Sequence, residues 1–202
     1  RLRPEEIAYT SVIDAYARLG YAKKCAAWLR SMQQAAVHPN ILPFNCVMAA
    51  CARVGHPKKA VAWFEEAVAA SLEPTHASYN AVIFAHGKVG KVDEAVLWHS
   101  KMVDAGIQPD EGTFTGVVAA CAKAGRASEA VKWLRRMSDH GLPASDAAYS
   151  VVVNACGKAG QVQEAIAWLG RMEAAGLRPG IRPHTSIISA FARAGDAEGA
   201  AA

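Results

Sequence analysis

The sequence lacks the features that mark several protein classes. No apolar run approaches the roughly 18 residues of a membrane-spanning helix, so we expect no membrane insertion. The chain begins at Arg1 without a leader-like stretch, so its targeting cannot be read from it. A Gly-rich phosphate loop, an HExxH motif and a convergent set of carboxylates are all missing. We therefore predict no enzyme, no cofactor, no metal site and no small-molecule substrate.

Strong charge of one sign is also missing. The net charge is +4, from 22 basic and 18 acidic side chains. This balance is compatible with a nucleic-acid partner but does not require one, because the placement of the charges matters more than their sum.

Aromatic residues make up only 7% of the chain, yet its five tryptophans recur at a fixed interval of 35 residues: Trp28, Trp63, Trp98, Trp133 and Trp168. A tandem repeat explains such spacing, whereas a single globular core does not. The predicted units are 6–40, 41–75, 76–110, 111–145 and 146–180, with 1–5 as the tail of a preceding repeat and 181–202 as a partial sixth repeat. Because neither end shows a polar capping helix, we expect a segment of a longer array.

Each unit, numbered from position 1 to 35, shows the pattern of two helices. Apolar residues at positions 4, 7, 8 and 11 form one helical face, as in Phe44, Val47, Met48 and Cys51. A glycine at position 15 ends this helix in all six units. A second helix follows, usually with Ala at position 20 and Met at 27, and with Trp at 23 in the five complete units. We predict an all-α fold, a right-handed solenoid of tandem 35-residue helical hairpins that forms an α-α superhelix.

Cysteines are few, odd in number and never arranged as CxxC. Cys51, Cys121 and Cys156 share position 11, so stacked helices would separate them by about 8–10 Å. A disulfide needs Cα atoms within roughly 7 Å. We therefore expect buried, reduced thiols, and we expect the tryptophans to pack between repeats rather than on a ligand.

The pattern resembles the pentatricopeptide repeat (PPR) family, of the plain 35-residue P-type. The third unit carries the resemblance best, in Tyr79-Asn80, Gly90, Asp93-Glu94-Ala95, Met102 and Gly106-Ile107-Gln108-Pro109-Asp110. The peptide-binding tetratricopeptide repeat is the nearest alternative, but its period is 34 and its Trp lies early in the first helix. A regular Trp at position 23 departs from the usual PPR pattern. Alanine-rich units with Cys and Trp resemble those of an alga or related protist.

The resemblance implies a protein that binds single-stranded RNA, mRNA or rRNA, along its first helices at one nucleotide per repeat. Such a protein acts in a mitochondrion or chloroplast, where it protects, processes or helps to translate a transcript. The alternative is a structural PPR subunit of a large organellar complex, such as a mitochondrial ribosome, with non-coded contacts to RNA or proteins.

The family reads each base edge with position 5 and position 35 of one unit. The corresponding residues here are Thr10 with Asn40, Asn45 with Thr75, Asn80 with Asp110, Thr115 with Ser145, Ser150 with Gly180, and Thr185 in the partial unit. The family code then implies adenine, a pyrimidine, uracil, adenine and an unresolved, purine-leaning site. The same residue types also cap helices and form turns, so both interpretations stay open.

Two further positions extend the implied interface. Position 2 packs on the base, and only Ile7 and Leu42 are suited to this, since the later units carry Ala77, Gly112, Ala147 and Arg182. Position 13 is basic in every unit, with Arg18, Arg53, Lys88, Lys123, Lys158 and Arg193. These side chains predict a phosphate-contacting stripe. They also suit the last turn of a helix, where cations are favoured.

Overall fold

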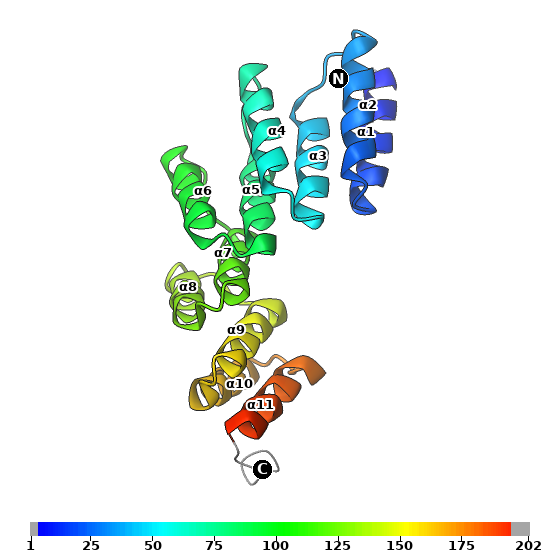
Figure 1. The fold of residues 1–202 in the computed structure, drawn as a ribbon. Helices are drawn as coiled ribbons and strands as arrows, with labels where there is room; N and C mark the ends of the chain where they lie inside the picture. The colour runs from blue at the N-terminus through cyan, green and yellow to red at the C-terminus, as the bar shows by residue number, and fades with distance from the viewer. Residues whose placement is uncertain (1–3, 195–202) are drawn as a thin grey trace. The chain divides into compact units, whose positions relative to one another are not determined.

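The computed structural model describes residues 4–194, which form helices joined by short turns and contain no strand (Figure 1). The helices are α1 (Pro4–Arg18), α2 (Ala22–Gln34), α3 (Ile41–Arg53), α4 (Pro57–Ala69), α5 (His76–Val89), α6 (Val92–Asp104), α7 (Glu111–Lys123), α8 (Ala127–Asp139), α9 (Asp146–Lys158), α10 (Val162–Ala174) and α11 (Ile181–Ala194). The all-α helical repeat array is therefore confirmed. Within the described part, no helix is long and apolar enough to cross a membrane.

Glycine at position 15 ends the first helices as expected. Gly55 has a φ of +70°, a conformation that glycine adopts without the steric cost of a side chain. A Cβ atom here would lie 3.2 Å from Cγ of Lys88 and 3.3 Å from Cγ1 of Val89, at the end of α5. Gly55 therefore both turns the chain and lets the next hairpin approach closely. Gly195 lies outside the described residues.

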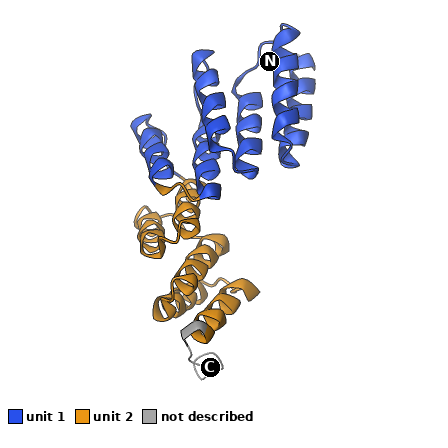
Figure 2. Cartoon of the chain, in the orientation of Figure 1, with its two compact units in different colours: residues 1–89, 93–109 blue, residues 90–92, 110–202 orange. Residues whose placement is uncertain are grey.

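The first compact unit comprises residues 1–89 and 93–109 (Figure 2). Helix α1 packs on α2 and α3, and α3 packs in turn on α4 and α5, so first helices contact first helices along the unit. Phe44, Val47, Met48 and Cys51 are each at most 1% exposed, which confirms the apolar face predicted for this helix.

The second compact unit comprises residues 90–92 and 110–202. Helix α7 packs on α8 and α9, and α9 packs on α10 and α11. Phe114, Val117, Val118 and Cys121 occupy the same four positions as the buried set of α3, and each is at most 1% exposed. Both units thus build their cores from the same periodic positions.

Each tryptophan has an aromatic partner within its own hairpin. The ring at position 4 of the first helix lies 5.9–6.2 Å from the indole in all five: Tyr9–Trp28, Phe44–Trp63, Tyr79–Trp98, Phe114–Trp133 and Tyr149–Trp168. Contacts between hairpins add to this, as where Phe64 lies 4.8 Å from Trp98. Trp98, Trp133 and Trp168 are at most 7% exposed, whereas Trp28 is 39% exposed. We expected packing between repeats, but the partner shared by all five closes the hairpin itself.

The cysteines form no disulfide in the described part of the chain. Cys51, Cys121 and Cys156 are buried, as expected from their position on the apolar face. Burial raises the pKa of the Cys156 thiol to about 11, so this thiol is protonated and unreactive at neutral pH.

Candidate nucleic-acid interface

The second hairpin brings its position 5 and position 35 side chains into direct contact. Nδ2 of Asn45 donates to Oγ1 of Thr75 at 3.1 Å. The hydroxyl of Ser78 donates to Oδ1 of Asn45 at 2.6 Å, while it accepts from the backbone N–H of Thr75 at 3.0 Å. Asn45 is 9% exposed and Ser78 is fully buried. This network fixes the orientation of the Asn45 amide, because both ends of the amide have a partner.

In the first hairpin, the side chains at positions 5 and 35 are both hydrogen-bonded to Glu6. Thr10 donates its hydroxyl to the carbonyl oxygen of Glu6 at 2.7 Å, and Nδ2 of Asn40 donates to the Glu6 carboxylate at 2.9 Å. Oδ1 of Asn40 accepts from the backbone N–H of Leu42 at 2.9 Å and so caps α3. The capping interpretation of position 35 is therefore correct for Asn40, and the cap also orients its side chain.

The third pair is divided between the two compact units. Asn80, in the first unit, has its Nδ2 atom 3.2 Å from Nδ1 of His76. Asp110, in the second unit, caps α7 in a reciprocal capping box, in which its carboxylate accepts from the backbone N–H of Thr113 at 2.8 Å. Each member is thus held by its own helix start.

The fourth and fifth pairs make fewer contacts. The hydroxyl of Thr115 is buried and has no hydrogen-bond partner among the described residues. Ser145 caps α9 by accepting from the backbone N–H of Ala148 at 3.4 Å. Ser150 donates to Asp146 at 3.3 Å, and its counterpart Gly180 has no side chain to offer. Thr185, in α11, donates back to the carbonyl oxygen of Ile181 at 2.9 Å.

Position 2 differs between the hairpins in both size and exposure. Ile7 is 50% exposed and Leu42 is 48% exposed, so neither large side chain serves the core. Ala77 and Ala147 are also exposed, but they present little apolar surface, and Gly112 presents none. Two of the hairpins thus hold aliphatic groups in solvent at the helix start that carries the polar pair.

The basic residues at position 13 lie in the last turn of each first helix. Arg18, Arg53, Lys88, Lys123 and Lys158 are all exposed. Arg18 forms an ion pair with Asp14 at 2.8 Å. The side chain of Arg193 lies outside the described residues. The helix-end placement agrees with the favourable interaction between a cation and the helix C-terminus, and it leaves these groups accessible to solvent.

Two residues that support the polar pairs were not predicted from the sequence. Glu6 and Ser78 hold the polar pairs of the first two hairpins, at positions 1 and 3 of their units. A serine on an otherwise apolar helix face was the available signal for Ser78. In the described part of the chain, no group of three or more His, Cys, Asp or Glu residues is arranged to hold a metal ion.

Models of three repeat families match the chain along its length. The model described as "Pentatricopeptide repeat domain" matches residues 2–53 and 29–89, and "PPR repeat family" matches residues 74–123. The model described as "Pentatricopeptide repeat-containing protein" matches residues 111–201. No curated protein sequence matches the chain significantly.

Solved structures of such proteins share the fold. The crystal structure of PPR10 from maize is 31% identical over 96% of this chain and 28% of its own, with a TM-score of 0.71. PPR10 in complex with an 18-nt psaJ RNA element is 24% identical over 97% of this chain and 32% of its own, with a TM-score of 0.75. The PPR domain of Arabidopsis thaliana protein-only RNase P 1, in complex with tRNA, is 14% identical over 76% of this chain and 81% of its own, with a TM-score of 0.64. The chain thus spans less than a third of the PPR10 chains.

Proposed function

The chain belongs to the pentatricopeptide repeat family, and from this premise we propose that it binds single-stranded RNA along the start of its first helices. In this proposal, positions 5 and 35 read base edges, position 2 packs on bases, and position 13 contacts phosphates. Short side chains with both donors and acceptors suit the reading of unstacked bases.

The hydrogen-bonded pair of Asn45 and Thr75 is the observation that best supports this proposal. Reading a base edge requires polar groups in a fixed orientation, and here Ser78 supplies the second partner that fixes the amide. Leu42, beside this pair, keeps 48% of its side chain exposed, which offers an apolar surface to a base.

Similar structures support an RNA ligand in this proposal. PPR10 was solved with an 18-nt RNA element, and the PPR domain of protein-only RNase P 1 with tRNA. We infer a P-type array that acts on transcripts in a mitochondrion or chloroplast, and an algal or protist source fits its alanine-rich units. No catalytic role is assigned to these repeats.

A second candidate function is a structural role in an organellar complex such as a mitochondrial ribosome. Gly112 and Ala147 favour it, because such small residues at position 2 would hold a base weakly. In this role the later hairpins would contact folded RNA or proteins through their surface rather than through a base code.

Replacing the residues of the third pair by those of the first tests directly whether positions 5 and 35 determine which base is bound. Asn80→Thr combined with Asp110→Asn creates the Thr–Asn combination of Thr10 and Asn40. Asn caps a helix about as well as Asp, as Asn40 does for α3, so the fold should be kept. Selection from randomised RNA should then show one base position that changes from uracil to adenine, while its neighbours stay the same.

The single variant Lys132→Gln is the control, because Lys132 is an exposed residue of α8 outside the proposed interface. It should leave the selected sequence unchanged. RNA binding by the parent chain with a log–log salt slope near −4 would agree with about six phosphate contacts at ~0.7 each. Binding without any selected motif would contradict coded reading and favour the structural candidate. The absence of RNA binding would contradict the proposed function and leave, of the structural candidate, only contacts with proteins.

A further inference from the structure

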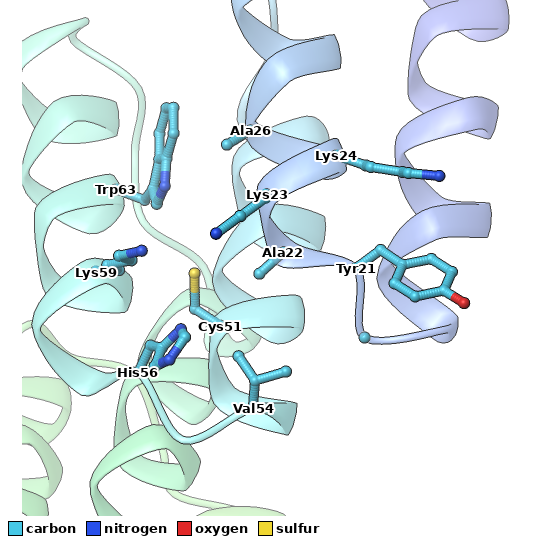
Figure 3. Close-up of a pocket in the computed structure, with 11 residues that line it drawn as sticks. Tyr21, Ala22, Lys23, Lys24, Ala26, Cys51, Val54, His56, Lys59 and Trp63 are labelled. Atoms are coloured by element: carbon cyan, nitrogen blue, oxygen red, sulfur yellow. The ribbon is translucent and has the colours of Figure 1, made fainter.

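A pocket of about 490 Å³ lies between the first and second hairpins, at the end opposite the proposed base-reading positions (Figure 3). It is lined by the turn after α1, the start of α2, the end of α3 and the start of α4. Lys23 and Lys59 reach into it from the two second helices, His56 lies at its lower edge in this view, and Trp63 forms its upper wall. Its size falls within the range of small-molecule sites.

The charges around this pocket have one sign. Three lysines and one histidine line it, and none of its described lining residues is acidic. Lys24 stacks over the rings of Tyr16 and Tyr21, at 5.2 and 5.3 Å, and points away from the space that Lys23 and Lys59 share. Two amines that converge without a carboxylate in the lining create a positive potential that a bound anion would neutralise.

The lysines occupy two positions at which the next three hairpins carry acidic or neutral residues. Positions 18 and 19 are Lys23-Lys24 and Lys58-Lys59 in the first two hairpins, but Asp93-Glu94, Ser128-Glu129 and Gln163-Glu164 in the next three. A helix start favours negative side chains, so lysine pairs in the first turns of α2 and α4 oppose the helix dipole. The helix dipole therefore does not explain Lys23 and Lys59, whereas an anionic ligand in the pocket that they line does.

The equivalent gap in the second unit is built differently. Between α8 and α10, Nε2 of Gln161 donates to Oγ of Ser128 at 3.4 Å, across positions equivalent to His56 and Lys23. Glu164 takes the place of Lys59 there. The same repeat can thus close this gap with neutral and acidic side chains, whereas the gap between the first two hairpins is basic.

The walls of the pocket indicate which anion fits. Ala22, Ala26 and Val54 are apolar, and the indole of Trp63 adds an aromatic wall. Arg30, whose guanidinium is ion-paired with Glu66, stacks on Trp63 at 4.6 Å from the ring centroid, so this indole already packs against a planar group. A cationic rim beside an aromatic wall is the combination that binds a phosphate together with a nucleobase.

We propose that this pocket binds a ribonucleoside phosphate, with the phosphate on Lys23 and Lys59 and the base against Trp63. The phosphate comes either from a free nucleotide or from the RNA strand of the proposed function, and in the second case the inference rests on that function. An acidic peptide shares only the charge, because it has no planar group for the Trp63 wall.

The first experiment uses adenosine monophosphate with the full chain labelled with 5-fluorotryptophan. The Trp63 resonance, assigned with Trp63→Phe, should shift on titration and should stay in place in Lys23→Gln/Lys59→Gln. Adenosine, which lacks the phosphate, should shift it far less. Equal shifts by adenosine, or a shift by polyglutamate without one by adenosine monophosphate, would overturn the proposal.

The second experiment measures RNA binding by fluorescence anisotropy. If RNA supplies the phosphate, Lys23→Gln/Lys59→Gln should weaken binding about tenfold and reduce the salt slope by ~1.4. Lys58→Gln/Lys132→Gln removes the same charge from two exposed lysines outside the pocket and should change affinity less than twofold. Circular dichroism should show the fold intact in both double variants.

The two experiments separate this proposal from the proposed function. RNA binding that both double variants weaken equally, without an adenosine monophosphate shift, would overturn the pocket and leave the proposed function standing. A parent chain that binds adenosine monophosphate at Trp63 but binds no RNA would support the pocket and remove the proposed function. An adenosine monophosphate shift with unchanged RNA affinity assigns the pocket to free nucleotides.

Discussion

The second and fourth hairpins place different groups at the same position of one repeat. Asn45 and Thr115 both occupy position 5, on helices whose four core positions are buried to the same extent. Asn45 has partners at both ends of its amide, whereas the Thr115 hydroxyl is buried without a partner in the described part of the chain. These two hairpins thus reproduce the apolar positions of the repeat, while their polar side chains at position 5 differ.

The first two hairpins also differ from the later ones at positions where their residues lower the stability of the fold. The first two hairpins place lysine pairs at a helix start, and they hold Ala36 and Ser71 at φ values of +55° and +58°. The next three hairpins have acidic or neutral residues in place of the lysine pairs, and glycine at the position of Ala36 and Ser71. The first two hairpins therefore depart from the stable pattern in two independent ways, and they also carry the exposed aliphatic residues at position 2.

Replacing the two position-5 residues should give the largest difference in stability between the second and fourth hairpins. Asn45→Ala removes the acceptor of the buried Ser78 hydroxyl, so we expect the free energy of unfolding to fall by about 2 kcal/mol. Thr115→Val keeps the shape and removes a hydroxyl without a partner, so it should be neutral or stabilising by up to ~1 kcal/mol. Urea unfolding followed by circular dichroism measures both. Equal losses in the two variants would mean that the Asn45 network contributes no more than packing.

The sequence predicted the periodic part of this molecule well. Helices α3, α5, α7, α9 and α11 begin at Ile41, His76, Glu111, Asp146 and Ile181, at the same 35-residue interval as the tryptophans, whereas α1 begins at Pro4. Apolar spacing and glycine placement suffice for this, because both act within one helix and its turn.

Contacts between different positions could not be predicted in the same way. Lys23 and Lys59 line one pocket although they occupy positions 18 and 19 of different units, so aligning equal positions does not bring them together. The tryptophans show the same limit, since a 35-residue period is compatible with partners in the same hairpin or in the next. Likewise, the burial of Asn45 depends on Ser78, which belongs to the following unit.

Exchanging residues at position 31 should sharpen the contrast in backbone strain. A left-handed conformation costs a residue with a Cβ about 1–2 kcal/mol, and glycine loses part of this advantage through its freedom in the unfolded chain. Ser71→Gly should therefore raise the free energy of unfolding by about 0.5–1 kcal/mol. Gly141→Ala should lower it by a similar amount, since no atom lies within 4 Å of the added Cβ and only the φ of +70° opposes it. If both changes had the same sign, the strain at Ser71 would not be the cause.

Exchanging residues at position 18 should give the smallest effect and the clearest dependence on salt. Lys58→Gln gives the second hairpin the residue of the fifth, and Gln163→Lys does the reverse; both side chains are exposed. Removing a cation from the first turn of α4 should raise the free energy of unfolding by about 0.5 kcal/mol, and adding one to α10 should lower it equally. Thermal unfolding at low and high ionic strength measures both, and high salt should diminish both differences because it screens exposed charges. A gain for Lys58→Gln that salt leaves unchanged would point to helix propensity instead, and it would remove the argument that the lysine pairs are retained against the helix dipole.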